Sequence, residues 1–260
     1  MKKPIPVLIF IMSLFLVWAC VKDNKLDYQS DPSRTNHEKD TLAFTDEEIA
    51  LIMAGDSADL MRVLTIHTIV YDTAGADWDT ITNQEDSIRL RTPSRDVRVD
   101  STDTILTRLI NRMLTTVHDP AHPGIGIAAP QVGINRNIIW VQRLDKVGNP
   151  FEVYLNVKIV AYSSKLIIFN GDGCLSIPGM SGKTDRYSSV CVEYDLPDGT
   201  HNCEVVEGYS SIGNCTAVIF QHEIDHLLGI LFIDRLHVYT KMDRDMFEVI
   251  ESAVNTMNAR

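Results

Sequence analysis

The segment from Val218 to Leu228 carries two histidines and two acids within an otherwise strongly apolar stretch. On a helix, His222 and His226 lie one turn apart and point the same way, with Glu223 beside the first of them. Apolar neighbours on nearly every side predict that this helix is buried. Burying such a polar cluster is costly unless a partner, such as a cation, offsets the cost. The fold must therefore accommodate a polar, metal-binding helix in its interior.

The HExxH spacing is typical of metal hydrolases. Two imidazoles bind one divalent cation, and the glutamate takes a proton from a water molecule that the cation activates. An ordinary solvated helix face is the alternative interpretation of so short a pattern. Phe232 stands where one large class of zinc proteases has its third ligand, which excludes that class. A late glutamate, Glu248 or Glu251, is the third ligand expected of another class.

Cys174 is the better candidate for the third ligand. It lies in the segment GDGCLSIP, residues 171–178, between a glycine and an extended apolar run. A thiolate there would complete a Cys-His-His set and leave a fourth position for water. The alternative is a free cysteine that is simply buried as a small apolar residue.

A third segment, GIGIAAPQ at residues 124–131, alternates tiny and apolar residues and ends on an amide. Gly124 and Gly126 would let the backbone of a ligand come close. Taken alone, the segment could be a plain glycine-rich turn. It is not a phosphate-binding loop, because no Lys-Ser/Thr pair follows to open a helix.

The order GIGIAAPQ, GCLS, HEIDH resembles the peptide deformylase family, whose motifs read GxGxAAxQ, EGCLS and HExDH. The resemblance covers residues 61–236, with an apparent insertion at 68–84, and the stretch Asp86–Arg91 resembles an early family segment. Asp172 stands where the family has glutamate. Aspartate keeps the charge but is one methylene shorter, so the sequence does not decide whether it reaches its expected partner, Arg186.

The resemblance implies a divalent metal held by Cys174, His222 and His226, with Fe²⁺ as the expected ion and Zn²⁺, Ni²⁺ or Co²⁺ as substitutes. It implies that Glu223 transfers the proton, while the Leu175 N–H and the Gln131 amide bind the oxyanion. The implied reaction releases formate from N-formylated peptides. The residues expected to bind the peptide are Ile125, Gly126, Asp172, Arg186, Cys215 and Ile219.

The N-terminus has the pattern of a bacterial lipoprotein signal. Two lysines precede an apolar run over residues 5–17, which ends at Ala19-Cys20. We expect a signal peptide at 1–19, acylation of Cys20, and a polar, disordered tether at 20–40. A plain cleaved signal with an incidental cysteine is the alternative. The lipid would anchor the protein on a membrane of the bacterial cell envelope, outside the cytoplasm.

Composition and local patterns complete the expectations. The chain has 260 residues and a net charge of −11, which makes nucleic acid an unfavourable partner, and we expect a monomer. An N-terminal extension with the insertion is predicted at 41–84, a catalytic domain at 85–237 and a final helix at 238–260. Thr45 and Ser101 are predicted to cap helices, the metal helix is predicted over 212–228, and a hairpin is predicted around Asp198-Gly199.

The predicted fold is α+β, with mainly antiparallel strands packed around the buried metal helix. Three cysteines that this scheme leaves over, Cys191, Cys203 and Cys215, are expected to be free thiols. Two other functions compete with deformylation. One is a lipid-anchored HExxH metalloprotease that uses a late glutamate, and the other is a non-catalytic lipoprotein that binds formylated peptides.

Overall fold

The computed structural model describes residues 41–66, 68–71, 78–81 and 83–237. From Leu42 onward they belong to one compact unit. The predicted signal at 1–19, the tether at 20–40, the acylated Cys20 and the final helix at 238–260 lie outside these residues, as do Glu248 and Glu251. No helix within the described ranges is long and apolar enough to cross a membrane.

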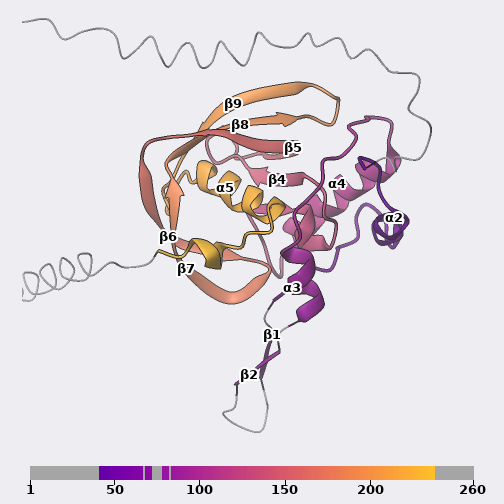
Figure 1. Ribbon diagram of the computed structural model, residues 1–260, viewed down its shortest axis with the longest axis horizontal. Coiled ribbons are helices and arrows are strands. Elements are labelled where there is room, and N and C mark those ends of the chain that lie inside the picture. The colour runs from indigo at the N-terminus through magenta and orange to yellow at the C-terminus, as the bar shows by residue number, and fades with distance from the viewer. Residues whose placement is uncertain (1–40, 67, 72–77, 82, 238–260) are drawn as a thin grey trace, which may run out of the picture. The chain divides into compact units, whose positions relative to one another are not determined.

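Antiparallel strands form the main sheet of the described chain, in the order β3-β4-β5-β8-β9, so that β3 and β9 are its edges (Figure 1). These strands are β3 (Gly126–Ala128), β4 (Ile138–Gln142), β5 (Phe151–Tyr162), β8 (Ser189–Asp195) and β9 (His201–Glu207). Two further antiparallel pairs are β6 (Leu166–Cys174) with β7 (Ile177–Tyr187), and β1 (Thr68–Tyr71) with β2 (Trp78–Ile81). The antiparallel α+β class predicted from the sequence is confirmed.

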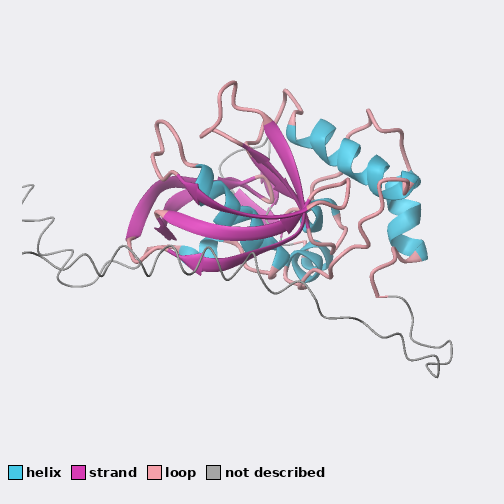
Figure 2. Ribbon diagram, turned by 90° about the horizontal axis from the view of Figure 1, so that it is seen from above, coloured by secondary structure: helices cyan, strands magenta, loops and turns pink. Residues whose placement is uncertain are grey.

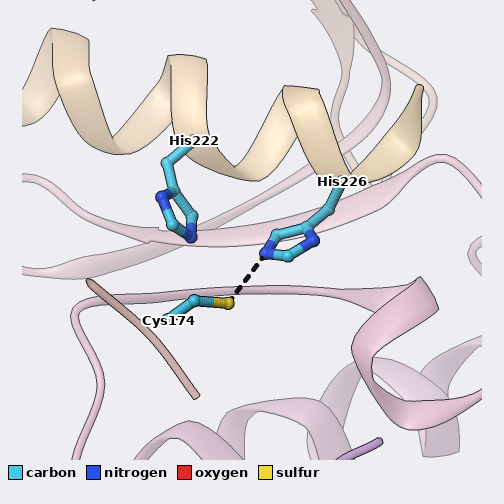
Figure 3. Close-up of side chains that lie close together, drawn as sticks. All are labelled: Cys174, His222 and His226. Carbon is cyan, nitrogen blue, oxygen red and sulfur yellow. Dashed lines mark hydrogen bonds between the residues drawn. The ribbon is translucent and has the colours of Figure 1, made fainter. Parts of the chain in front are cut away.

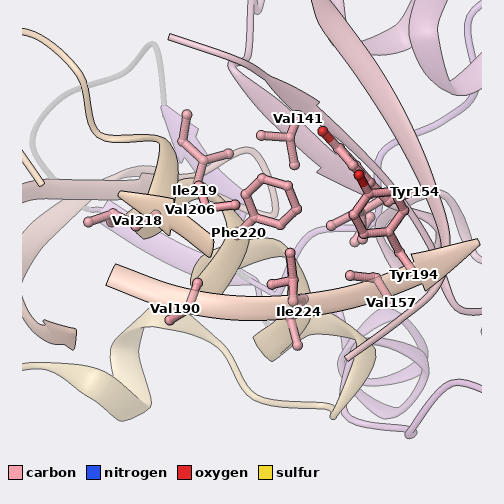
Figure 4. Packing of buried hydrophobic residues seen from close by; sticks show 14 of the residues in the cluster. Val141, Tyr154, Val157, Val190, Tyr194, Val206, Val218, Ile219, Phe220 and Ile224 are labelled. Carbon is pink, nitrogen blue, oxygen red and sulfur yellow. The ribbon is translucent and has the colours of Figure 1, made fainter. Parts of the chain in front are cut away.

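Helix α5 (Thr216–Leu227) lies between the main sheet and the β6–β7 pair (Figure 1). The view from above shows helical turns enclosed among strands (Figure 2). All its residues are buried, as the sequence predicts. Its apolar side chains join those of β4, β5, β8 and β9 in one core, where the rings of Phe220 and Tyr154 lie 4.8 Å apart (Figure 4). Burial of this apolar surface provides the main stabilisation of the region and fixes the orientation of the helix.

A second core lies between α4 (Thr104–Val117) and the opposite face of β3, β4 and β5. It includes Ile52 from α2 (Asp46–Met53), whose predicted capping box with Thr45 is confirmed. Arg112 of α4 is buried and donates to the carbonyl groups of Leu51 and Ile52 at 3.0 and 2.9 Å. These bonds satisfy carbonyls at the end of α2 and attach the N-terminal extension to the core.

The remaining elements connect the extension to the site. The insertion contributes the β1–β2 pair, and α3 (Gln84–Leu90) follows it. The 3₁₀ turn η1 (Ala129–Val132) includes the end of the GIGIAAPQ segment, and the 3₁₀ turn η2 (Phe232–Arg235) follows α5. The Leu64 N–H donates to the backbone carbonyl of Gln131 at 2.7 Å, and the Ile66 N–H donates to the backbone carbonyl of Ser176 at 3.1 Å. Part of the predicted extension therefore lies against the two loops that form the site.

Two local predictions are corrected, and one strand was not predicted. Helix α4 begins at Thr104 because the Asp103 carboxylate, not Ser101, accepts the N–H groups of its first turn. Helix α5 begins at Thr216 rather than at 212, after Cys215, which is its N-cap residue. Strand β7 was not predicted, because its glycines and proline are poor strand formers.

Candidate metal centre and peptide groove

The three predicted metal ligands come together in the structure. Cys174 ends β6, and the two histidines project toward it from α5 (Figure 3). Its sulfur lies 3.2 Å from Nε2 of His226. The candidate ligand atoms of Cys174, His222 and His226 all lie within 4.8 Å of one another. One cation can contact all three atoms at such separations.

An aspartate fixes the first histidine. Asp172 Oδ1 lies 2.8 Å from Nδ1 of His222. Its other oxygen accepts from Thr184 Oγ1 at 2.8 Å and from Arg186 Nη2 at 2.8 Å. The shorter side chain therefore does reach Arg186. Burial opposes ionisation of Asp172, but its bonds with His222 and Arg186 hold the pKa of the carboxyl well below its usual range. A carboxylate behind Nδ1 leaves Nε2 as the ligand atom of His222.

Arg186 belongs to a buried charge network rather than to the cavity wall. It donates from Nη1 to Asp225 Oδ2 at 2.6 Å, and Arg235 reaches the other oxygen of Asp225 at 2.8 Å. The arginine thus ties β7 to α5 behind the histidines. Its predicted pairing with Asp172 is present, and its side chain does not line the cavity. Asp225 stands in the HEIDH motif and could have been noticed there, whereas nothing local to Thr184 or Arg235 indicates their part.

Glu223 lies against the edge strand β3. Its Oε2 is buried and has no hydrogen-bond partner among the described residues. Burial raises the pKa of its carboxyl to about 7. A Cβ added to Gly126 would lie 2.5 Å from Glu223 Oε1 and 2.9 Å from Ile219 Cγ2. Glycine is thus required at this position so that the carboxylate can lie close to the strand.

The residues present fit a divalent cation. A thiol and two imidazoles form a donor set suited to zinc or to borderline transition metals. Burial lowers the pKa of His226 well below its ordinary value, whereas burial of His222 is outweighed by Asp172 and Cys174, which raise its pKa and favour a positive charge at this position. Glu223 lines the cavity, and its buried Oε2 lacks a hydrogen-bond partner among the described residues, as expected of a site that holds an added polar group.

Gln131 lies beside the candidate metal ligands in a fixed orientation. Its Oε1 accepts from the Ala128 N–H at 2.8 Å, which directs the NH₂ group toward Cys174 Sγ at 3.5 Å. Ser176, a residue not singled out in the sequence, is fully buried and lies 3.4 Å from the same NH₂ group. Gln131 and Leu175 both line the cavity next to the ligands. Two candidate oxyanion donors thus lie in one place.

A cavity of about 980 Å³ opens at this centre. Among the predicted peptide-binding residues, Ile125, Gly126, Asp172, Cys215 and Ile219 line it, and Arg186 does not. Segment 60–65 of the extension also contributes side chains to the wall, which the sequence did not indicate. Because β3 pairs only with β4 in the described chain, its other edge is open toward an extended peptide.

Comparisons with known proteins agree with this geometry. The family model for polypeptide deformylase matches residues 78–242. A peptide deformylase of Rhizobium meliloti is 36% identical over 150 residues, which are 57% of this chain and 79% of the relative. The chloroplastic/mitochondrial peptide deformylase 1B of Arabidopsis thaliana is 38% identical over 145 residues, 55% of this chain and 50% of that protein.

Solved structures give the same result. A class I type b peptide deformylase from Acinetobacter baumannii superposes with a TM-score of 0.53 at 28% identity, over 68% of this chain and 99% of that one. The Thermotoga maritima enzyme gives a TM-score of 0.53 at 28% identity, over 69% and 99%. The family model, the sequence relatives and the fold agree: this chain belongs to the peptide deformylase family, whose members are metal-dependent hydrolases that act on N-formylated peptides.

Proposed function

We propose that Cys174, His222 and His226 hold one Fe²⁺ ion and that Glu223 serves as the proton carrier for hydrolysis of formyl-methionyl peptides. The observation that carries this proposal is the convergence of the sulfur and both imidazoles beside a cavity that Cys174, His222 and Glu223 line and that an open sheet edge borders. The products are formate and a peptide with a free N-terminal amine.

The metal, when bound, acts as a Lewis acid on the formyl carbonyl and lowers the pKa of a water molecule. Glu223 takes a proton as water attacks the formyl carbon and delivers it to the departing amine nitrogen. The Gln131 amide and the Leu175 N–H donate to the oxygen on which negative charge develops. Gly126 pairs with the peptide backbone along the open edge of β3 and holds the formyl group beside Glu223.

A formate-release assay on formyl-Met-Ala with metal-loaded protein tests this function. Wild type is expected to release one formate per peptide. Glu223→Gln should lower kcat by about 10²–10⁴-fold while retaining the metal. Cys174→Ala should lose the metal and the activity together. Internal peptide cleavage with metal retained in Cys174→Ala would instead indicate a protease, and tight peptide binding without formate would indicate a receptor.

The location is a separate part of the proposal. The lysine pair, the short apolar run and Ala19-Cys20 support cleavage before Cys20 and its acylation. An enzyme exported in this way would act on secreted or scavenged formyl peptides. Mass spectrometry of the N-terminal peptide from the membrane fraction should find residue 20 carrying acyl chains. Unmodified Cys20, or an intact residue 1 in the cytosol, would contradict this location without affecting the enzymatic proposal.

Elemental analysis of the purified protein tests the identity of the metal. We expect iron to be the major metal in protein purified without oxygen, because members of the deformylase family commonly use Fe²⁺, and a thiolate with two imidazoles suits such borderline divalent ions. Elemental analysis before and after chelation gives the ratio of metal to protein. A stoichiometric zinc content in protein isolated without added metal would contradict the choice of Fe²⁺ and leave the ligand set unchanged.

A further inference from the structure

Two cysteines meet on the outer face of the β8–β9 hairpin. In this register Cys191 is directly opposite Val205, and Cys203 is directly opposite Glu193. The two cysteines are therefore diagonal neighbours on the same face of the pair. Their sulfur atoms lie 3.4 Å apart. The hairpin predicted around Asp198-Gly199 is confirmed, and the diagonal contact brings together two of the cysteines that the sequence predicts to be free thiols.

We propose that Cys191 and Cys203 are a disulfide-forming pair, oxidised by exchange with an external disulfide. A disulfide has a sulfur–sulfur bond of about 2.05 Å, so the two sulfur atoms need to approach by roughly 1.4 Å. Closing this gap takes side-chain rotation together with a small adjustment of the two strands, because diagonal neighbours usually lie about 7–8 Å apart and a disulfide spans Cα separations of up to about 6.8 Å. Cys203 is exposed and Cys191 is half-buried, so an external reagent can reach the pair.

The chemistry requires one co-reactant, a low-molecular-weight or protein disulfide. The Cys203 thiol loses its proton to solvent, and the thiolate attacks one sulfur of the donor disulfide, releasing the first donor thiolate. The Cys191 thiol then loses its proton, and its thiolate displaces the second donor thiolate from Cys203. One sulfur–sulfur bond forms in the protein and one breaks in the donor. The two cysteines lose two electrons, and the donor gains them with two protons to become two thiols.

The other described cysteines lie apart from this pair. Cys215 is buried at the start of α5, and Cys174 belongs to the candidate metal centre. The link would instead fasten edge strand β9 to β8. On the inner face of these strands, Val190 and Val206 pack in the same core as α5. The cross-link therefore stabilises the sheet edge that covers the metal helix, without adding a group to the cavity.

Incubation of the full-length, metal-loaded protein with oxidised glutathione tests the pair. The protein is then denatured, alkylated, digested and analysed by mass spectrometry. The expected product is a Cys191–Cys203 linked peptide whose mass is lower by two hydrogens, with Cys215 still alkylated. Oxidised wild type should also melt roughly 5–10 °C above the reduced protein. Both thiols remaining alkylatable, stable mixed disulfides with glutathione, or a link to another cysteine would overturn the proposal.

Matched variants separate the link from general oxidation. In Cys203→Ser, Cys191 should remain a thiol or a mixed disulfide, and the shift in melting temperature should vanish. Cys191→Ser should behave in the same way. A shift that persists in either single variant would show that oxidation acts elsewhere and would refute the assignment. The outcome is independent of the enzymatic proposal, because none of these readouts measures formate release.

Discussion

Gly126→Ala is predicted to disable the enzyme while leaving its metal in place. The new Cβ would lie 2.5 Å from Oε1 and 2.9 Å from Cδ of Glu223, and 2.9 Å from Cγ2 of Ile219. Carbon and oxygen atoms in contact normally lie about 3.5 Å apart, so the carboxylate must move by up to about 1 Å. Ile219 is held in the core of α5 and cannot yield as easily.

A misplacement of about 1 Å can lower the rate about 10²-fold. We therefore expect kcat for formate release to fall about 100-fold, with the metal content unchanged. The overpacking itself is expected to cost about 1–3 kcal/mol of stability, which urea unfolding measures. This separates loss of activity from loss of fold, because the assay can be run where both proteins are folded.

Gly173→Ala is the matched control. Gly173 lines the same cavity, but a Cβ there would lie 3.5 Å from Met180 O and 3.7 Å from Ser181 Cβ, which is ordinary contact. This variant should retain kcat within a few-fold. A Gly126→Ala enzyme with a wild-type kcat would refute the reasoning, since Glu223 would then not need its observed position.

Three further predictions concern the buried charges. Asp172→Asn removes the carboxylate behind His222 and should weaken metal affinity about 10–100-fold, as measured by chelator competition. Arg186→Met leaves two buried carboxylates without their shared partner and should cost about 3–5 kcal/mol in urea unfolding. Burial opposes ionisation of Glu48, but its bonds with Arg136 and the cap keep its pKa below the ordinary value. The ionised Glu48 therefore contributes its full stabilisation above about pH 4.3, the pKa of an unfolded glutamate, and this contribution is lost as the pH falls through the folded pKa. In Glu48→Gln, the free energy of unfolding should consequently fall less steeply as the pH is lowered.

Exposed neighbours provide the controls. Arg89→Met removes a cation that is 45% exposed and pairs with an exposed glutamate, so unfolding should change by less than about 1 kcal/mol. Glu47→Gln, at a carboxylate that is 73% exposed, should likewise change the free energy of unfolding by less than about 1 kcal/mol. Metal affinity retained in Asp172→Asn, or equal costs for Arg186→Met and Arg89→Met, would contradict the roles given to these side chains.

Local chemistry determined what the sequence could predict. The capping box at Thr45 and the spacing of His222 and His226 are decided within a few residues, and both were predicted. Strand β7 was missed because Pro178 and its glycines oppose strand formation, and pairing with β6 overrides this preference. The contact between Arg186 and Asp172 joins two strands, so its geometry depends on register rather than on local sequence.

The same distinction between local pattern and tertiary contact applies to the residues of the candidate site. Motif spacing indicated the ligands, because metal chemistry restricts the residue types that can serve. It could not indicate segment 60–65 as part of the wall, since nothing in that segment marks it for binding. The diagonal sulfur contact was missed for a related reason. Direct opposition in a hairpin can be counted from the turn, whereas twist decides which diagonal neighbours touch.

The open edge of β3 has a consequence for which peptides can be processed. Ile125 O accepts from the Gln142 N–H, so strand alternation directs the N–H and C=O groups of the next residue, Gly126, away from β4. A substrate is then aligned through its main chain, whatever its later side chains are. Proline or an N-methylated residue at the paired position lacks the donor and should be discriminated against. Selectivity beyond the first residue thus concerns backbone shape rather than side-chain identity.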